Sequence, residues 1–228
     1  MLISLLALGF LLGLKHALEA DHVAAVTSLV TRSASLRETL RVSGAWGLGH
    51  AATMIVFGTV LILLGATLPD NVVRALEAVV GVMLVVLGID VLRRLLKKKI
   101  HVHDHTHDHG VRHVHVHMHE RQVSRHEHAH AAVLWPRALV VGCVHGLAGT
   151  AGLVLLALPT VSSGASAALY LVVFGVGTVA GMILFSLVIS VPLAMSVQRL
   201  RWAAYGLEGT VGFANIVLGI WIAVQSLA

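Results

Sequence analysis

Charged residues are scarce in this sequence. Of its 228 residues only 12% are Asp, Glu, Lys or Arg, whereas 57% are hydrophobic, and the mean hydropathy is +0.88. A soluble domain carries about 25% charged residues, so this chain has too few to cover a water-exposed globular surface. The composition excludes a disordered protein and most cytosolic enzymes. It predicts an all-α fold, a polytopic membrane protein.

Cysteine is nearly absent as well. Cys143 is the single one, which excludes an internal disulfide framework and a cysteine-based zinc knuckle. No lysine follows a glycine, so the Gly-Lys-Ser/Thr of a P-loop is missing and ATP hydrolysis would need another subunit. We therefore expect a protein that is not an enzyme and that has no resident cofactor.

Six apolar segments are each long enough for the roughly 20 residues of a spanning helix. We expect one transmembrane helix in each, at residues 2–30, 42–68, 72–96, 133–160, 166–197 and 203–227. No basic residue precedes the first apolar run, which continues past Lys15 without a good cleavage site. We therefore expect a retained helix and not a signal peptide.

Basic residues mark one side of this bundle. They gather between the first and second, third and fourth, and fifth and sixth spans, whereas the opposite side has only Arg74. Lys and Arg are enriched in cytoplasmic loops. The pattern predicts an inner (plasma) membrane protein with both termini outside and the long loop after the third span in the cytoplasm. These residues act as topology signals, so we expect the bilayer as partner and no nucleic acid.

The two halves of the sequence resemble each other. Residues 75–89 match 206–220 at eight of fifteen positions, 47–57 match 175–185 at six of eleven, and His16 aligns with His145. The alternative is chance similarity between Leu- and Gly-rich helices, but the three blocks keep their order and spacing. Three spans per half predict two inverted three-helix repeats, with a site near the midplane between them. The expected units are residues 1–96 and 132–228, joined by a loop at 97–131.

The densest polar cluster inside a span comprises His16, Glu19, Asp21 and His22. Ionisable groups within a membrane are costly and face a cavity or a partner. On a continuous helix His16, Glu19 and His22 share one face, whereas Asp21 points elsewhere and either braces a neighbour or marks a distorted helix. Imidazole and carboxylate suit borderline divalent metals such as Ni, Co, Zn or Fe. The alternative is a polar cluster at the membrane surface.

Two further histidines lie in spans. His50 follows the small residues Gly47-Leu-Gly and is a candidate third imidazole of a metal site; the alternative is a packing residue at a close helix contact. His145, the repeat mate of His16, is a candidate ligand that acts transiently or at a gate. Its half of the sequence lacks counterparts of Glu19, Asp21 and His22.

Three carboxylates remain inside or near spans. Glu77 and Glu208 are repeat mates, and both are expected to snorkel to the interface or to cap a helix. Asp90 is expected to pair with Arg93 or Arg94. The roles of Glu77 and Glu208 stay open at this point.

Twelve of the sixteen histidines fall between His101 and His130. Alternating His and Asp offer many weak, overlapping ligand sets, because an imidazole with a free pKa near 6.5 is mostly neutral at cytoplasmic pH. The loop is predicted to buffer transition metal; a solvated linker is the alternative.

The motif His16-x4-Asp21-His22 resembles the signature of the nickel/cobalt transporters of the NicO superfamily. Trp46-Gly-Leu-Gly-His50 and Val144-His-Gly-Leu-Ala148 are similar to its six-span UreH-type members, which are associated with urease maturation. The resemblance implies metal-site roles for His16, Asp21, His22 and His50. The chain lacks the extra span and the later motifs of the eight-span importers, and its His-rich loop is similar to that of the efflux branch.

These features predict a permease that moves Ni²⁺, or Co²⁺, inward as its substrate and supplies the maturation of a metalloenzyme such as urease or hydrogenase. Two alternatives stay open: proton-coupled efflux for resistance, and a membrane metal chaperone that does not transport. A soluble metallochaperone or a second copy of the chain stays open as a further partner.

Overall fold

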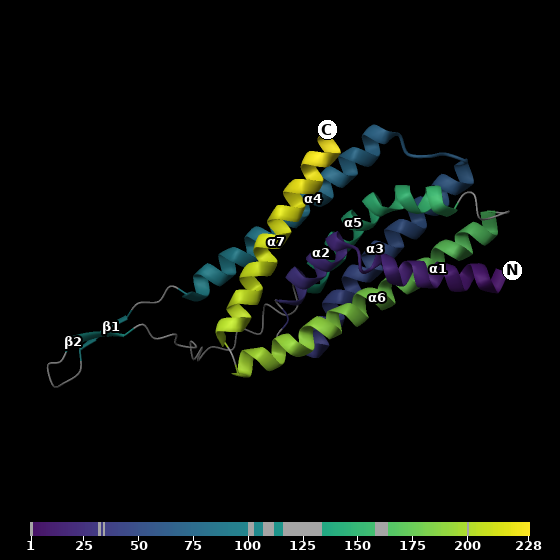
Figure 1. Ribbon diagram of the computed structural model, residues 1–228. Coiled ribbons are helices and arrows are strands. Elements are labelled where there is room, and N and C mark those ends of the chain that lie inside the picture. Colours follow the sequence, from purple (N-terminus) through teal and green to yellow (C-terminus); the bar gives the residue numbers. More distant parts are fainter. Residues whose placement is uncertain are drawn as a thin grey trace.

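The computed structural model describes the backbone of residues 2–31, 33, 35–99, 103–106, 112–115, 134–157, 164–199 and 201–228. Within these ranges it has seven helices and one short hairpin (Figure 1). The hairpin pairs two antiparallel strands, with His103 opposite His115. The elements are α1 (Leu2–His16), α2 (Ala20–Val30), α3 (Leu36–Leu64), α4 (Asp70–Lys99), β1 (His103–Thr106), β2 (Arg112–His115), α5 (Leu134–Ala157), α6 (Gly164–Arg199) and α7 (Arg201–Leu227).

The chain is a multi-pass membrane protein. In the described ranges four stretches are long and apolar enough to cross a bilayer: α3, Asp70–Leu96 in α4, Ala165–Ser190 in α6 and Tyr205–Leu227 in α7. The helices α1 and α2 together form a fifth candidate. The fourth predicted span, residues 133–160, overlaps α5, whose side chains after residue 150 lie outside the description. The predicted His-rich loop at 97–131 contains β1 and β2, which its low-complexity sequence does not signal.

The first span departs from its prediction as one continuous helix. Its helical hydrogen bonds stop at Ala17-Leu-Glu19, and the axes of α1 and α2 meet at 60°. No glycine or proline lies at the break. Instead, tight-turn bonds replace the helical ones, from Leu18 N–H to Lys15 and from Glu19 N–H to His16. The helical-wheel face predicted for His16, Glu19 and His22 therefore does not exist.

Helices from the two halves of the chain interlock. α1 packs along α6, α3 packs along α5 and α6, and α4 packs along α7. A β-carbon on Gly13 of α1 would clash with the Phe174 carbonyl of α6, and one on Gly142 of α5 would clash with the Trp46 carbonyl of α3. The second contact repeats the first with the partners exchanged, since Gly142 follows Gly13 by 129 residues and Phe174 follows Trp46 by 128.

The glycine contacts between α4 and α7 also repeat when the two halves of the chain are exchanged. Gly81 lies against Gly219, and Gly88 lies against Gly212, so the two helices run antiparallel with their backbones in close contact. Gly212 and Gly219 each follow a glycine of α4, Gly81 and Gly88, by 131 residues. Small residues permit such close approach of helices in a membrane.

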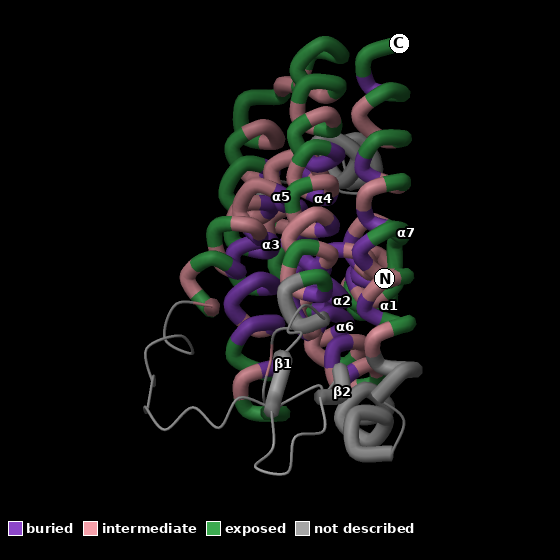
Figure 2. The backbone as a smooth tube through the Cα atoms, turned by 90° about the vertical axis from the view of Figure 1, so that its left-hand side faces the viewer, coloured by how far each residue is buried: buried purple, intermediate pink, exposed green. Residues whose placement is uncertain are grey.

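Burial follows the position of each helix face. Buried residues line the centre of the bundle, and exposed ones cover its outside (Figure 2). Many exposed residues are large and apolar, such as Leu63, Val86 and Val188, as expected of a surface that meets lipid. Several buried hydroxyls donate to a carbonyl of their own helix: Thr150, for example, donates to the Gly146 carbonyl at 2.7 Å.

Candidate metal centre

All four histidines outside the loop meet at the centre of the bundle. They come from different helices: His16 from the end of α1, His22 from α2, His50 from α3 and His145 from α5. The ring centroid of His22 lies 4.4 Å from that of His16, 4.8 Å from that of His50 and 4.2 Å from that of His145. His22, His50 and His145 are at most 1% exposed. Four imidazoles from four helices thus share one small volume.

The first candidate ligand set is His16, His22 and His50. One ligand atom of each lies within 4.8 Å of the other two, and the Nε2 atoms of His22 and His50 are 3.4 Å apart. Ligand atoms on opposite sides of one ion are about 4.2 Å apart, twice a metal–nitrogen bond of about 2.1 Å. His16 Nε2 and His50 Nδ1 are buried and have no hydrogen-bond partner among the described residues. Such atoms leave lone pairs or protons for a ligand.

The second candidate set is Asp21, His22 and His145, which shares His22 with the first. Asp21 Oδ1 lies 3.0 Å from His22 Nδ1, and Asp21 Oδ2 lies 2.8 Å from His145 Nε2. Asp21 stands in the first turn of α2, where the helix dipole favours a negative charge. The carboxylate therefore fixes the orientation of two imidazoles from two halves of the chain.

Glu19 has a more peripheral position than the other predicted residues. Its carboxylate lies 3.0 Å from His16 Nδ1, and its side chain is 55% exposed. It belongs to neither three-ligand set in the described residues. Through this contact Glu19 orients the His16 ring and directs Nε2 toward the other imidazoles.

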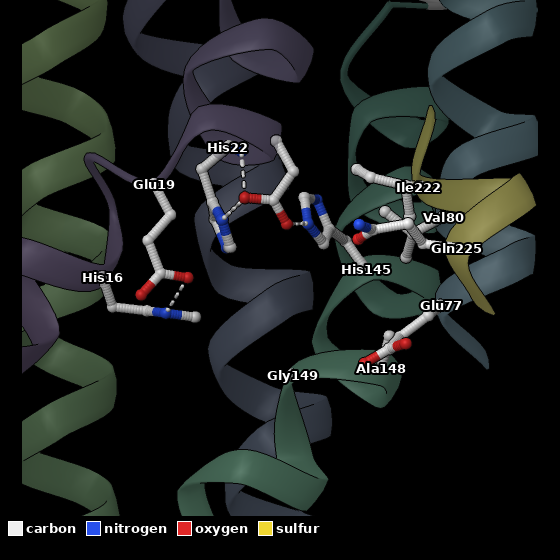
Figure 3. Close-up of a pocket in the computed structure, with 11 residues that line it drawn as sticks. His16, Glu19, His22, Glu77, Val80, His145, Ala148, Gly149, Ile222 and Gln225 are labelled. Carbon is white, nitrogen blue, oxygen red and sulfur yellow. Dashed lines mark hydrogen bonds and ion pairs between the residues drawn. The ribbon is translucent and has the colours of Figure 1, made fainter. Parts of the chain in front are cut away.

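A pocket of about 300 Å³ opens beside these groups (Figure 3). α1, α2 and α5 provide the ligand side, and α4 and α7 provide the facing wall with Glu77 and Gln225. His50 does not line the pocket and lies behind it, fully buried. The lining residues are His16, Glu19, Asp21, His22, Glu77, Val80, His145, Ala148, Gly149, Ile222 and Gln225.

Two residues of the site were missed by sequence reasoning. Trp46 is fully buried, and its ring lies 5.8 Å from that of His22 and 5.9 Å from that of His145. Its position one helical turn before His50 was the available signal. Glu77, whose role was left open, is exposed and lines the pocket. Its repeat mate Glu208 is 8% exposed, and the predicted pairing of Asp90 is confirmed.

That ion pair joins Asp90 to Arg94 at 3.0 Å on α4.

Comparison with known proteins places the chain in a family. The model of the family described as Cytochrome C biogenesis protein transmembrane region matches residues 22–221. The urease accessory protein UreH of Bacillus sp. (strain TB-90) is 36% identical over 219 residues, which cover 96% of this chain and 90% of that protein. The chain belongs to the UreH family. No solved structure matches it.

Membership in the UreH family extends over almost the whole chain, whereas the transmembrane family model begins at His22. His16, Glu19 and Asp21 lie before that match, and His22, His50 and His145 lie within it. The match to a UreH protein therefore agrees with the UreH-type motifs found around His50 and His145. An imidazole-rich set with one carboxylate is suited to a borderline divalent metal ion.

Proposed function

We propose that this protein carries Ni²⁺, or Co²⁺, into the cell for the maturation of a metalloenzyme such as urease. The observation that carries the proposal is the convergence of His16, His22, His50 and His145 with Asp21 beside a pocket in a membrane bundle. The family supports the metabolic context, because the relative is named a urease accessory protein. The resemblance of His16-x4-Asp21-His22 to the NicO signature supports nickel or cobalt as the substrate.

We assign the two ligand sets to successive steps in the passage of the ion. Asp21, His22 and His145 line the pocket and meet the arriving ion first. The ion then passes to His16 and His22, which also line the pocket, and to His50, which lies behind it. Because His22 belongs to both sets, it keeps contact with the ion throughout the step. Replacing one ligand at a time avoids full dehydration of a dication in the membrane, which is costly.

Orientation follows from the basic loops. The pocket lining includes two exposed residues, Glu77 near the start of α4 and Gln225 near the end of α7, which we take as its mouth. Both positions lie at the ends that the positive-inside rule assigns to the outer face. A potential of about 100 mV, negative inside, favours the inward movement of a dication by about 4.6 kcal/mol, more than a thousandfold in concentration. Uptake therefore needs no ATP.

We further propose six spans arranged as two inverted halves. The exchange of contacts supports this arrangement: α1 with α6 corresponds to α5 with α3, and the crossings of α4 with α7 and α3 with α6 map onto themselves. In this scheme α1–α2 corresponds to α5, and the ligand site lies where the halves meet, as in other secondary transporters built from inverted repeats.

Radioactive nickel flux into proteoliposomes tests the function. With the purified protein inserted, we expect nickel to accumulate when the lumen is negative and accumulation to stop when the potential is reversed. Flux that requires a proton gradient and runs against the potential would favour efflux instead. Tight nickel binding without flux under any gradient would favour the membrane chaperone.

A further inference from the structure

The pocket opens through a mouth that has a counterpart elsewhere in the fold. Exchange of the halves pairs Glu77 with Glu208 and Ile222 with Val91, each 131 residues apart. At the open mouth, Glu77 is exposed and Ile222 is half-buried. Their counterparts are closed: Val91 is 1% exposed and Glu208 is 8% exposed. Residues at equivalent positions of the two halves therefore differ in exposure: one pair is accessible to solvent, and the other is buried.

The crossing of α4 and α7 relates the two mouths. Glu77 lies one helical turn before Gly81, and Glu208 lies one turn before Gly212. Because Gly81 packs on Gly219 at one end of the crossing and Gly212 packs on Gly88 at the other, the two carboxylates flank opposite ends. Glu77 lines the pocket, whereas Glu208 is 8% exposed, and Gly209 beside it lies against Leu95 of α4.

A second observation at the open mouth also points to a bound cation. His145 is 1% exposed and lines the same pocket as Glu77, and its Nδ1 atom has no hydrogen-bond partner among the described residues. A carboxylate at the mouth and a buried imidazole with an unpartnered nitrogen form a route for a cation. A carboxylate in the equivalent closed position is then expected to serve the same cation on its other side.

We propose that Glu208 forms the closed exit of the transport path, and that the ion leaves past it when the two halves exchange conformations. This inference rests on the proposed nickel transport. In the structure described, which the proposed orientation makes the outward-open state, Glu77 collects the dication, while Val91 and Glu208 seal the opposite side. In the exchanged state, Ile222 closes over the outer mouth and Val91 becomes accessible from the cytoplasmic side.

Single cysteines at the paired positions test the exchange. In a Cys143→Ala background, we introduce Ile222→Cys or Val91→Cys. Both variants leave Glu77 and Glu208 in place, and the two substituted positions are equivalent in the repeat. A membrane-impermeant thiol reagent should modify Ile222→Cys from outside without nickel. It should modify Val91→Cys from the cytoplasmic side, about tenfold faster when nickel is being transported, because a minor state of 0.1–10% then becomes populated.

The two proposals fail differently in this experiment. Absence of nickel flux in the unmodified protein would overturn the transport function itself. If that protein transports nickel but Val91→Cys stays unreactive, or reacts from the same side as Ile222→Cys, only the exit would be overturned.

A second pair of variants tests whether the Glu208 carboxylate takes part in nickel exit. Glu208→Gln should lower nickel flux by about tenfold or more while nickel bound per chain at equilibrium stays unchanged, because the four-histidine centre is intact. Glu208→Asp should restore part of the flux. The control is Asp70→Asn, which removes one charge from α4 without touching the pocket lining. Normal flux in Glu208→Gln would overturn the assignment.

Discussion

The histidines of this protein occupy two regions that are built in opposite ways. Twelve lie close together in the sequence between His101 and His130. The other four are spread from His16 to His145, yet neighbouring ring centroids lie only 4.2–5.5 Å apart. Composition alone supplies ligands in the loop, whereas helix packing assembles them in the membrane. Single substitutions should therefore matter in the membrane site and hardly at all in the loop.

The largest contrast is expected for His22→Ala against His105→Ala. His22 belongs to both ligand sets, so its loss should abolish nickel flux in proteoliposomes while the protein still inserts. His105 has many neighbours of the same kind in the loop, so its loss should leave flux near normal. Comparable flux in the two variants would remove the membrane site from the transport path.

Asp21→Asn should have the next largest effect. Asparagine keeps the shape but loses the charge that holds His22 and His145 at 3.0 and 2.8 Å. Loss of a carboxylate that orients imidazole ligands costs roughly 10- to 100-fold in affinity or activity. The half-saturating nickel concentration for flux should rise within that range. An unchanged value would show that Asp21 neither binds the ion nor orients its ligands.

Deletion of residues 101–130 should separate binding from transport. Flux at saturating nickel should persist, because the proposed path lies in the helices, while calorimetry should detect fewer ions bound per chain. Acidification below about pH 6 should release the same loop-bound ions, since protonated imidazole cannot ligate metal. If flux vanished in a folded deletion variant, the loop would belong to the path. If the bound metal stayed constant, the loop would be only a linker.

Glu19→Gln should have the smallest effect of the four. Glu19 is 55% exposed, belongs to neither ligand set and forms its ion pair with His16. An amide that can still hydrogen-bond His16 should therefore change the half-saturating nickel concentration only a few-fold, by about 1 kcal/mol. Flux measured across nickel concentrations gives this value. Complete loss of flux would instead make Glu19 a direct ligand of the ion.

Much of the architecture could be predicted from hydropathy, because a bilayer imposes long apolar helices on any spanning sequence. The described helices α3, α4, α6 and α7 overlap four of the predicted apolar segments. The off-face position of Asp21 predicted a distorted helix as one of two alternatives. The place and size of the break between α1 and α2 could not be predicted, since no residue at 17–19 is a helix breaker. It arises where polar side chains turn toward partners on other helices.

The same limit applied to the site. All four histidines were candidates, because an ionisable group inside a span needs a partner. Which groups meet was not readable from spacing: Asp21 bonds His145, 124 residues away, and the pocket wall bearing Glu77 comes from α4. Such contacts are set by tertiary packing, on which local periodicity carries no information.

The interlocked helices also constrain how the protein is made. α1 finds its main packing partner in α6, and α3 finds its partners in α5 and α6. During synthesis the first four helices therefore reach the bilayer before the surfaces that complete them exist, and Gly13 and Gly49 have no opposing backbone until the second half follows. Fragments 1–96 and 132–228 should each be degraded when expressed alone, whereas the two expressed together should reassemble into a stable bundle.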